Sequence, residues 1–250
     1  MKKLLLLITL STSVLYTIAQ DSTKSDVDPN FHFGMKGSLG FAWLRSDTKD
    51  VESDGAIMRA SYGFIADFKF AQNYAFSTGV DVSYKGGKLK RQVDTRTIST
   101  TTGDTTDLTQ IYEQRTRATY VEVPLTVRLK TNQIGYVKYY LQVGLAPGFN
   151  IKASYNADID QETQLNGDIV KTEKVELEDE DLSEDINFFN LSMIIGAGFE
   201  YNLTGTTNLI TGISFSNGFL DISDKKATNP VVSGTKLNSN MISLNVGILF

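Results

Sequence analysis

The stretch FHFGMKGSLGFAW, residues 31–43, decides the fold, because apolar and polar side chains alternate along it. Successive side chains of a β-strand point to opposite faces, so this period of two predicts a strand with one apolar and one polar face. The same pattern recurs at residues 57–70, 74–85, 121–130, 137–146, 191–201, 209–216 and 242–250. The sequence therefore predicts an all-β chain of eight strands.

The composition excludes several kinds of chemistry. The 250 residues include no Cys, which removes disulfides, Cys-based metal sites and thiol chemistry. Lys and Arg number 24 against 29 Asp and Glu, and a net charge of −5 does not suit a partner that is a polyanion. We expect no nucleic-acid partner, no cofactor and no metal site.

The polar faces of the predicted strands distinguish a lipid-spanning barrel from a water-soluble one. They combine Gly and Ser with charges of both signs, which suits a narrow barrel interior. The apolar faces carry aromatic residues at both strand ends, as in the two girdles of a membrane barrel. These residues are Phe31, Phe33, Phe68, Phe70, Tyr74, Phe199, Tyr201 and Phe250 at one end and Trp43, Tyr84 and Phe149 at the other. A soluble, lipocalin-like ligand-binding barrel is the alternative.

The lengths of the connections fix the predicted orientation. Those after the second, fourth and sixth strands are short, whereas the others are long and polar. Short turns face the periplasm and long loops face outward in outer-membrane barrels. We therefore predict an eight-stranded antiparallel transmembrane β-barrel with short periplasmic turns and long extracellular hairpin loops, integral to the outer membrane and surrounded by its lipid.

The beginning of the chain predicts export. Lys2 and Lys3 precede an apolar run that reaches Ala19 and is too interrupted by Ser and Thr for a membrane-spanning helix. We expect residues 1–19 to be a signal peptide that is removed, residues 20–30 to be a short periplasmic segment and residues 31–250 to form the barrel domain. No Cys follows the cleavage point to carry a lipid anchor.

A barrel of eight strands encloses little more than its own side chains. Inward charges must then neutralise one another, because an unpaired charge in a confined interior is costly. We predict a lumen charge network made of Lys36, Asp67, Asp81, Glu122, Arg128 and Lys138. Such a network would plug the barrel, and a narrow ion path along the same residues is the alternative.

Two long connections predict hairpins that project outward. One, at residues 86–119, is rich in Thr and turns at residues 102–104, while the other turns at Asn166-Gly167, a pair that favours two-residue hairpin turns. The free edges of these hairpins could accept a strand from a partner. We therefore predict adhesion or protein docking, with simple shielding of the cell surface as the alternative.

Charged residues in the loops permit two further predictions. Lys85, Lys88, Lys90 and Arg91 lie where the third strand leaves the bilayer, at the height of lipopolysaccharide phosphates, which we expect them to contact. Seven carboxylates between Glu176 and Asp185 have no base among them. Their spacing matches no calcium loop of defined geometry, so we interpret them as solvated charge.

An enzyme is the competing class of protein, because some small outer-membrane barrels act on lipids. Hydrolysis of the serine and histidine type needs its base beside the nucleophile at the outer rim. His32 is the single histidine, and the first strand places it at the periplasmic end. The sequence therefore predicts no enzymatic activity.

Four features together resemble the PorT-like family of small outer-membrane β-barrels of the Bacteroidetes. They are YVEVPL at residues 120–125, LAPG at 145–148, GAGFEY at 196–201 and the terminal Phe250. The resemblance spans residues 31–250 and implies an eight-stranded barrel in which Phe250 is read by the barrel-insertion machinery. Some members are tied to a protein-secretion system, so the alternative function is an accessory role in secretion. The family offers no catalytic motif to transfer.

Overall fold

The computed structural model describes residues 30–98, 105–166 and 168–250, which are built almost entirely of antiparallel strands. The strands are β1 (Phe31–Ser46), β2 (Val51–Ser53), β3 (Ile57–Ala71), β4 (Tyr74–Ile98), β5 (Thr105–Glu122), β6 (Leu125–Lys130), β7 (Val137–Leu165), β8 (Asp168–Asp181), β9 (Phe189–Thr204), β10 (Thr207–Gly218) and β11 (Leu237–Leu249). The predicted signal peptide lies outside the described residues. Within the described residues, no helix is long and apolar enough to cross a membrane.

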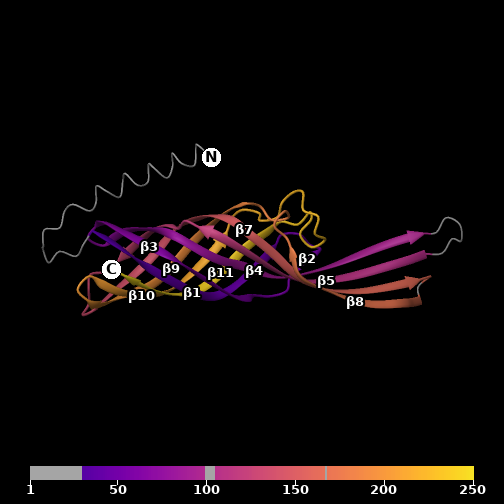
Figure 1. Ribbon diagram of the computed structural model, residues 1–250, viewed down its shortest axis with the longest axis horizontal. Helices are drawn as coiled ribbons and strands as arrows, with labels where there is room; N and C mark the ends of the chain where they lie inside the picture. Colours follow the sequence, from indigo (N-terminus) through magenta and orange to yellow (C-terminus); the bar gives the residue numbers. More distant parts are fainter. Residues whose placement is uncertain (1–29, 99–104, 167) are drawn as a thin grey trace.

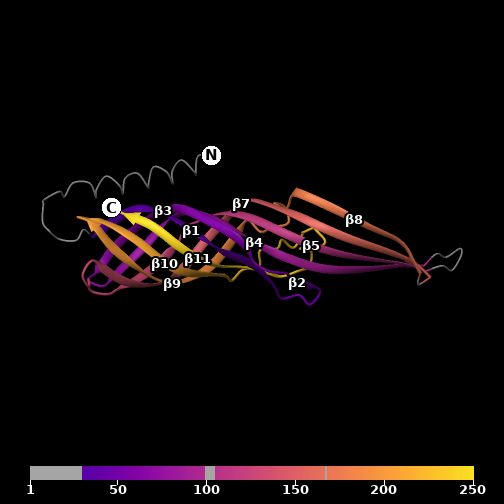
Figure 2. The ribbon, with the colours of Figure 1, turned by 90° about the horizontal axis from the view of Figure 1, so that it is seen from below.

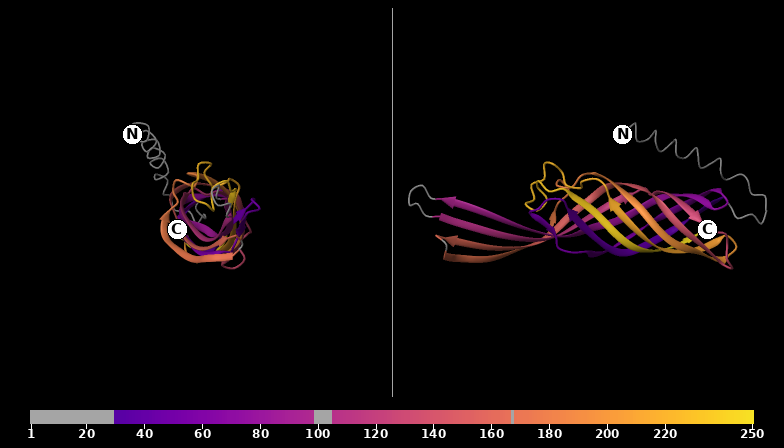
Figure 3. Two further views of the ribbon diagram at one scale, coloured as in Figure 1. Left: turned by 90° about the vertical axis from the view of Figure 1, so that its right-hand side faces the viewer. Right: turned by 180° about the vertical axis from the view of Figure 1, so that it is seen from behind.

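Eight strand positions close into a barrel, seen end-on in Figure 3. β1 pairs with β3, β3 with β4, and the ring runs on through β7, β9, β10 and β11 back to β1. The position between β4 and β7 is shared end to end by β5 and β6. The break falls at Val123-Pro124, because Pro124 has no N–H to donate to a neighbouring strand. The predicted eight-stranded antiparallel barrel is confirmed.

The apolar faces point outward, as predicted. Phe64 and Leu141 are 64% and 61% exposed on the outer surface, whereas the inward Ser38 and Ser192 are 8% and 0% exposed. The aromatic residues gather at both ends of the barrel. At the periplasmic end, the rings of Phe33 and Phe250 lie 6.0 Å apart, and at the outer end those of Trp43 and Phe215 lie 6.1 Å apart. This separation of faces suits a wall between hydrocarbon and a polar lumen.

Four strands project beyond the barrel as one antiparallel sheet, in the order β4, β5, β7, β8 (Figures 1 and 2). The two predicted hairpins are therefore joined, because β5 pairs with β7 from Thr106 opposite Leu165 down to the barrel. The turn predicted at residues 102–104 lies outside the described residues. Asn166 has a φ of 52°, and its side-chain Oδ1 accepts a hydrogen bond of 2.9 Å from the Thr105 N–H. We call this unit the projecting sheet.

An apolar core closes the outer mouth of the barrel where the projecting sheet begins. Its buried residues come from the barrel rim and from the connections before β9 and β11. They are Leu44, Val51, Leu89, Ala118, Tyr120, Ala153, Leu182, Ile186, Ile222, Ala227, Val231, Val232 and Leu237. The connection between β10 and β11, yellow at the junction in Figure 1, supplies much of this cap. The expectation that the long connections are simply polar is wrong for this one, because its aliphatic residues pack into the barrel mouth.

Polar contacts hold the cap in place. The Arg91 guanidinium on β4 donates to the Pro230 carbonyl oxygen and, at 3.1 Å, to that of Ser233. The Asp185 carboxylate, 8% exposed, accepts hydrogen bonds from the backbone N–H groups of Thr228 at 2.6 Å and Asn229 at 3.2 Å. Asp185 is therefore not the solvated charge that its place in an acidic run predicts.

Candidate functional site

A buried cluster of four charges crosses the lumen toward its periplasmic end. Arg128 lies 3.0 Å from Asp67 and 3.9 Å from Glu200, while Lys130 lies 3.1 Å from Asp67 and 2.7 Å from Glu200. The side chains of Asp67 and Arg128 are only 1% and 5% exposed. Two cations thus balance two carboxylates, which is what a charged group in a confined interior requires.

A second group of charges lies deeper in the lumen. Lys36 is 2.7 Å from Asp81, and Lys85 is 2.5 Å from Glu122. The Lys85 ammonium also donates to Ser192 Oγ at 3.2 Å. The predicted contact of Lys85 with lipopolysaccharide is wrong: its side chain is 2% exposed, because Lys85 shares the inward face of β4 with Asp81.

Five of the six predicted lumen residues thus lie in two groups of ion pairs. The sixth, Lys138, lies opposite Glu200 in the register between β7 and β9. The network predicted from the sequence leaves out Lys130 and Glu200. The alternation places both on the polar faces of their strands, since Lys130 has the parity of Arg128 on β6 and Glu200 that of Ser192 on β9.

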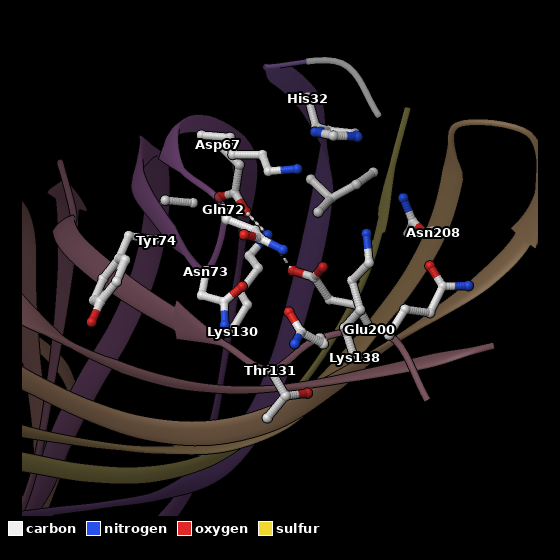
Figure 4. A pocket seen from close by; sticks show the side chains of 15 residues that line it. His32, Asp67, Gln72, Asn73, Tyr74, Lys130, Thr131, Lys138, Glu200 and Asn208 are labelled. Atoms are coloured by element: carbon white, nitrogen blue, oxygen red, sulfur yellow. Dashed lines mark hydrogen bonds and ion pairs between the residues drawn. The ribbon is translucent and has the colours of Figure 1, made fainter. Parts of the chain in front are cut away.

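A polar cavity of about 180 Å³ opens at the periplasmic end (Figure 4). His32, Lys69 and Lys138 line it together with the Asp67, Lys130 and Glu200 side chains of the charged cluster. His32 therefore lies at the periplasmic end, where the first strand predicts it. A smaller cavity of about 70 Å³ lies on the other side of Arg128, among Lys36, Asp81 and Lys85.

Two glycines make room for the side chain that supports Arg128. The Arg128 guanidinium stacks on the Tyr140 ring, with its Cζ atom 4.9 Å from the ring centroid. A Cβ added at Gly198 or Gly212 would approach the Tyr140 hydroxyl oxygen to 2.6 Å. Glycine on the polar face is therefore a packing requirement of this narrow interior.

Two of the other residues at the predicted lipopolysaccharide contact, Lys90 and Arg91, have protein partners. Lys90 donates a 2.7 Å hydrogen bond to the Glu113 carboxylate on β5, and this bond raises the pKa of Lys90 and lowers that of Glu113. Arg91 holds the cap, as described above. Lys88 lines a groove on the projecting sheet beside Arg115.

The projecting sheet has two free edges. β8 pairs with β7 along one side, and no described strand lies along its other side. Thirteen of its 14 residues are exposed, including Ile169 at 62% and Val170 at 57%. At the opposite edge, β2 covers β4 only from Leu89 to Arg91. The backbone N–H and C=O groups along these edges are available to another strand.

A comparison with protein families agrees with this architecture. The model described as outer membrane protein beta-barrel domain matches residues 18–224. The chain belongs to this family. As an outer-membrane barrel, it lies in the outer membrane with lipid around its apolar faces. No curated protein matches it in sequence.

Solved structures similar to this outer-membrane barrel come from several bacteria. Neisserial surface protein A is 13% identical, with 89% of this chain and 98% of that chain covered and a TM-score of 0.37. Ail, the attachment invasion locus protein of Yersinia pestis, is 15% identical, with 89% and 100% covered and a TM-score of 0.30. OprG from Pseudomonas aeruginosa is 12% identical, with 91% and 99% covered and a TM-score of 0.38.

Proposed function

We propose that this barrel is a surface interaction protein whose projecting sheet docks an extended segment of a protein partner. The observation that carries this proposal is the outer edge of β8, a 14-residue strand, along which no described strand lies. A partner strand added to that edge would gain main-chain hydrogen bonds along its length, and its side chains would set specificity. Adhesion to another surface uses the same contact.

The charges of β8 fit this role. Lys171, Glu173 and Lys174 interrupt its apolar residues, and charged side chains protect an exposed edge from indiscriminate pairing. A partner with complementary side chains overcomes this protection, whereas a second copy of β8 carries the same excess of acidic over basic residues. The edge is therefore suited to a selective partner.

We propose that the lumen is a plug that stiffens the barrel below the sheet. The paired charges, the small inner cavity and the apolar cap all support this role over an ion path. An ion that passed through would have to separate a buried ion pair, and this would leave a charge without its partner in a confined interior. The barrel then acts as an anchor, and no enzymatic activity is proposed for it.

Further parts of the proposal concern export and assembly. We propose that residues 1–19 direct export and are removed, that residues 20–30 lie in the periplasm and that residues 31–250 form the barrel. Phe250, 48% exposed beside Phe33 on the outer surface, is the proposed contact of the insertion machinery. Lys88 and Lys90 at the outer rim are proposed contacts for lipopolysaccharide phosphates.

The resemblance to the PorT-like family favours a second candidate function, an accessory role in a protein-secretion system. The polar cavity at the periplasmic end supports it, because its charged lining faces the side from which periplasmic partners arrive. In that role the partner would contact the periplasmic turns, and the projecting sheet would not be the main binding surface.

One experiment separates these functions. A photo-crosslinking amino acid is placed at Thr172 on the free strand β8, at Gln133 in a periplasmic turn, or at Thr109 on the central strand β5 as a control, and intact cells are irradiated. Docking predicts a discrete protein adduct at Thr172 and none at Thr109, whereas the secretion role predicts an adduct at Gln133 alone. Added protease that cuts the projecting sheet shows that the sheet is accessible at the cell surface. In such cells, the absence of an adduct at Thr172 would refute docking.

A further inference from the structure

The polar cavity of about 180 Å³ at the periplasmic end reaches the buried charged cluster in the lumen. Two carboxylates of that cluster, those of Asp67 and Glu200, line it, and these residues are 1% and 5% exposed. Side chains from opposite sides of the barrel wall complete the lining, as Asn73 and Asn208 show in Figure 4. The cavity is therefore a pocket with charged walls that opens toward the periplasm.

Positive charge is in excess around this cavity. The buried cluster balances its two cations against its two carboxylates. Lys69 and Lys138 add two more ammonium groups to the lining, and no further carboxylate among the described residues lines it. Four cations thus face two anions. A cleft in which one sign of charge prevails attracts the opposite sign, so the cavity favours an anionic occupant.

The chain enters β1 at the rim of the same cavity. The Asn30 carbonyl oxygen accepts a 2.7 Å hydrogen bond from the backbone N–H of Lys69, one of the lining residues. The ten residues before Asn30 read QDSTKSDVDP and lie outside the described residues. They include three Asp and one Lys. We call residues 20–29 the acidic segment.

Short tethers keep two carboxylates of the acidic segment near the cavity. Asp28 and Asp26 precede Asn30 by two and four residues, and a chain spans at most about 3.6 Å per residue. Their Cα atoms therefore cannot lie farther than about 7 Å and about 14 Å from that of Asn30. Groups on such short tethers have effective concentrations of about a millimolar or more, which a free anion would have to exceed to compete.

We propose that the acidic segment binds in this cavity. Its Asp26 and Asp28 carboxylates pair with the two ammonium groups that lie outside the buried cluster, and they cover the periplasmic mouth of the lumen. Ammonium groups donate to carboxylate oxygens, and such charge-assisted hydrogen bonds are stronger than neutral ones. Four cations are then balanced by four carboxylates. The inference rests on the proposed removal of residues 1–19, which leaves the acidic segment at the start of the exported chain.

Protection of a thiol in the cavity tests the proposal. The chain has no Cys, so Asn208→Cys places a single thiol on the lining. The probe is iodoacetamide, an uncharged reagent, applied to the full chain in lipid nanodiscs at about pH 9.5, where thiols are largely ionised. Asp26→Asn with Asp28→Asn should speed the labelling at least about tenfold, because hydrogen bonds to charged groups contribute that much.

Matched variants locate the contact. Lys69→Gln with Lys138→Gln should speed the labelling equally, and combining them with the Asp substitutions should add nothing, because both sets remove the same contact. Lys225→Gln with Lys226→Gln removes the same charge from the connection between β10 and β11 and should change the labelling less than about twofold. Asn73→Cys repeats the series with a thiol on the opposite side of the cavity.

Four outcomes would overturn the inference. Two of them are labelling that the Asp substitutions leave unaltered, and effects of the Asp and Lys substitutions that add. Protection of the purified chain that requires added phosphate would assign the cavity to a free anion. Protection that is present in cells and absent from the purified chain would assign it to a periplasmic partner. Variants are compared only where trypsin resistance of the barrel is unaltered.

Mass spectrometry of the purified chain separates this inference from the proposed export. A chain that begins at residue 20 and shows no protection refutes the inference alone. A chain that begins after Asp28 refutes both the inference and the proposed cleavage point.

Discussion

Replacing Lys85 with Met should destabilise the barrel far more than loss of a surface charge would. Glu122 and Lys85 are 9% and 2% exposed in their side chains, and the Lys85 ammonium also serves Ser192 Oγ. Removing one partner of such a buried pair leaves an uncompensated charge, at a cost of about 3–5 kcal/mol. An exposed Lys at the lipid headgroups would cost about 0–1 kcal/mol instead. The free energy of unfolding thus reports on which side of the barrel wall Lys85 lies.

The double variant, Lys85→Met with Glu122→Met, provides the control. Replacing both members of a buried ion pair with apolar residues is often neutral or stabilising. The double variant should therefore regain most of the stability that the single variant loses. The coupling between the two sites, measured by the complete mutant cycle, should exceed about 2 kcal/mol.

Urea unfolding in lipid vesicles measures these differences. Trp43 is the single Trp, and its ring near Phe215 at the outer end of the barrel reports on unfolding by fluorescence. A loss below about 1 kcal/mol in Lys85→Met would refute the buried pair. A double variant less stable than Lys85→Met would also refute it. The loss in the single variant could not then come from an unpaired Glu122 charge.

Three further predictions concern other contacts. Arg128→Met should cost about 3–5 kcal/mol in the same unfolding assay, because Asp67 and Glu200 then share Lys130. A loss below about 1 kcal/mol contradicts this. Arg91→Ala should speed trypsin cleavage of the connection between β10 and β11, because two carbonyl contacts of the cap are lost, while barrel cleavage stays unchanged. The pKa of Glu113 is lowered in the folded chain, so its pairing with Lys90 is present above the unfolded pKa and lost as pH falls through the folded one. Lys90→Gln should raise the Glu113 pKa, as followed by NMR titration, and an unaltered titration would refute the pairing.

The alternation that identifies the barrel wall depends only on neighbours in the sequence. Lys36, Asp67, Asp81, Glu122 and Arg128 are assigned to the lumen because each occupies the polar position of its strand, and strand geometry alone fixes that face. Lys85 has the same parity as Asp81 and belongs with them. Its assignment to lipid headgroups fails because the face of the strand, and not the height along it, decides what a side chain contacts.

Sequence alone determined the eight strands, the outward apolar faces, the two aromatic ends and the projecting hairpins, because each depends on local periodicity or turn chemistry. Tertiary structure alone decided how strands far apart in the sequence are brought into register. That register makes Lys130 and Glu200 complete the charged cluster and joins the hairpins through β5 and β7. It also brings Val231 and Val232 from a loop into the barrel mouth. These contacts depend on how distant strands and loops are brought together in the folded barrel. The alternation of residues within one strand does not show which residues of another strand will lie beside it.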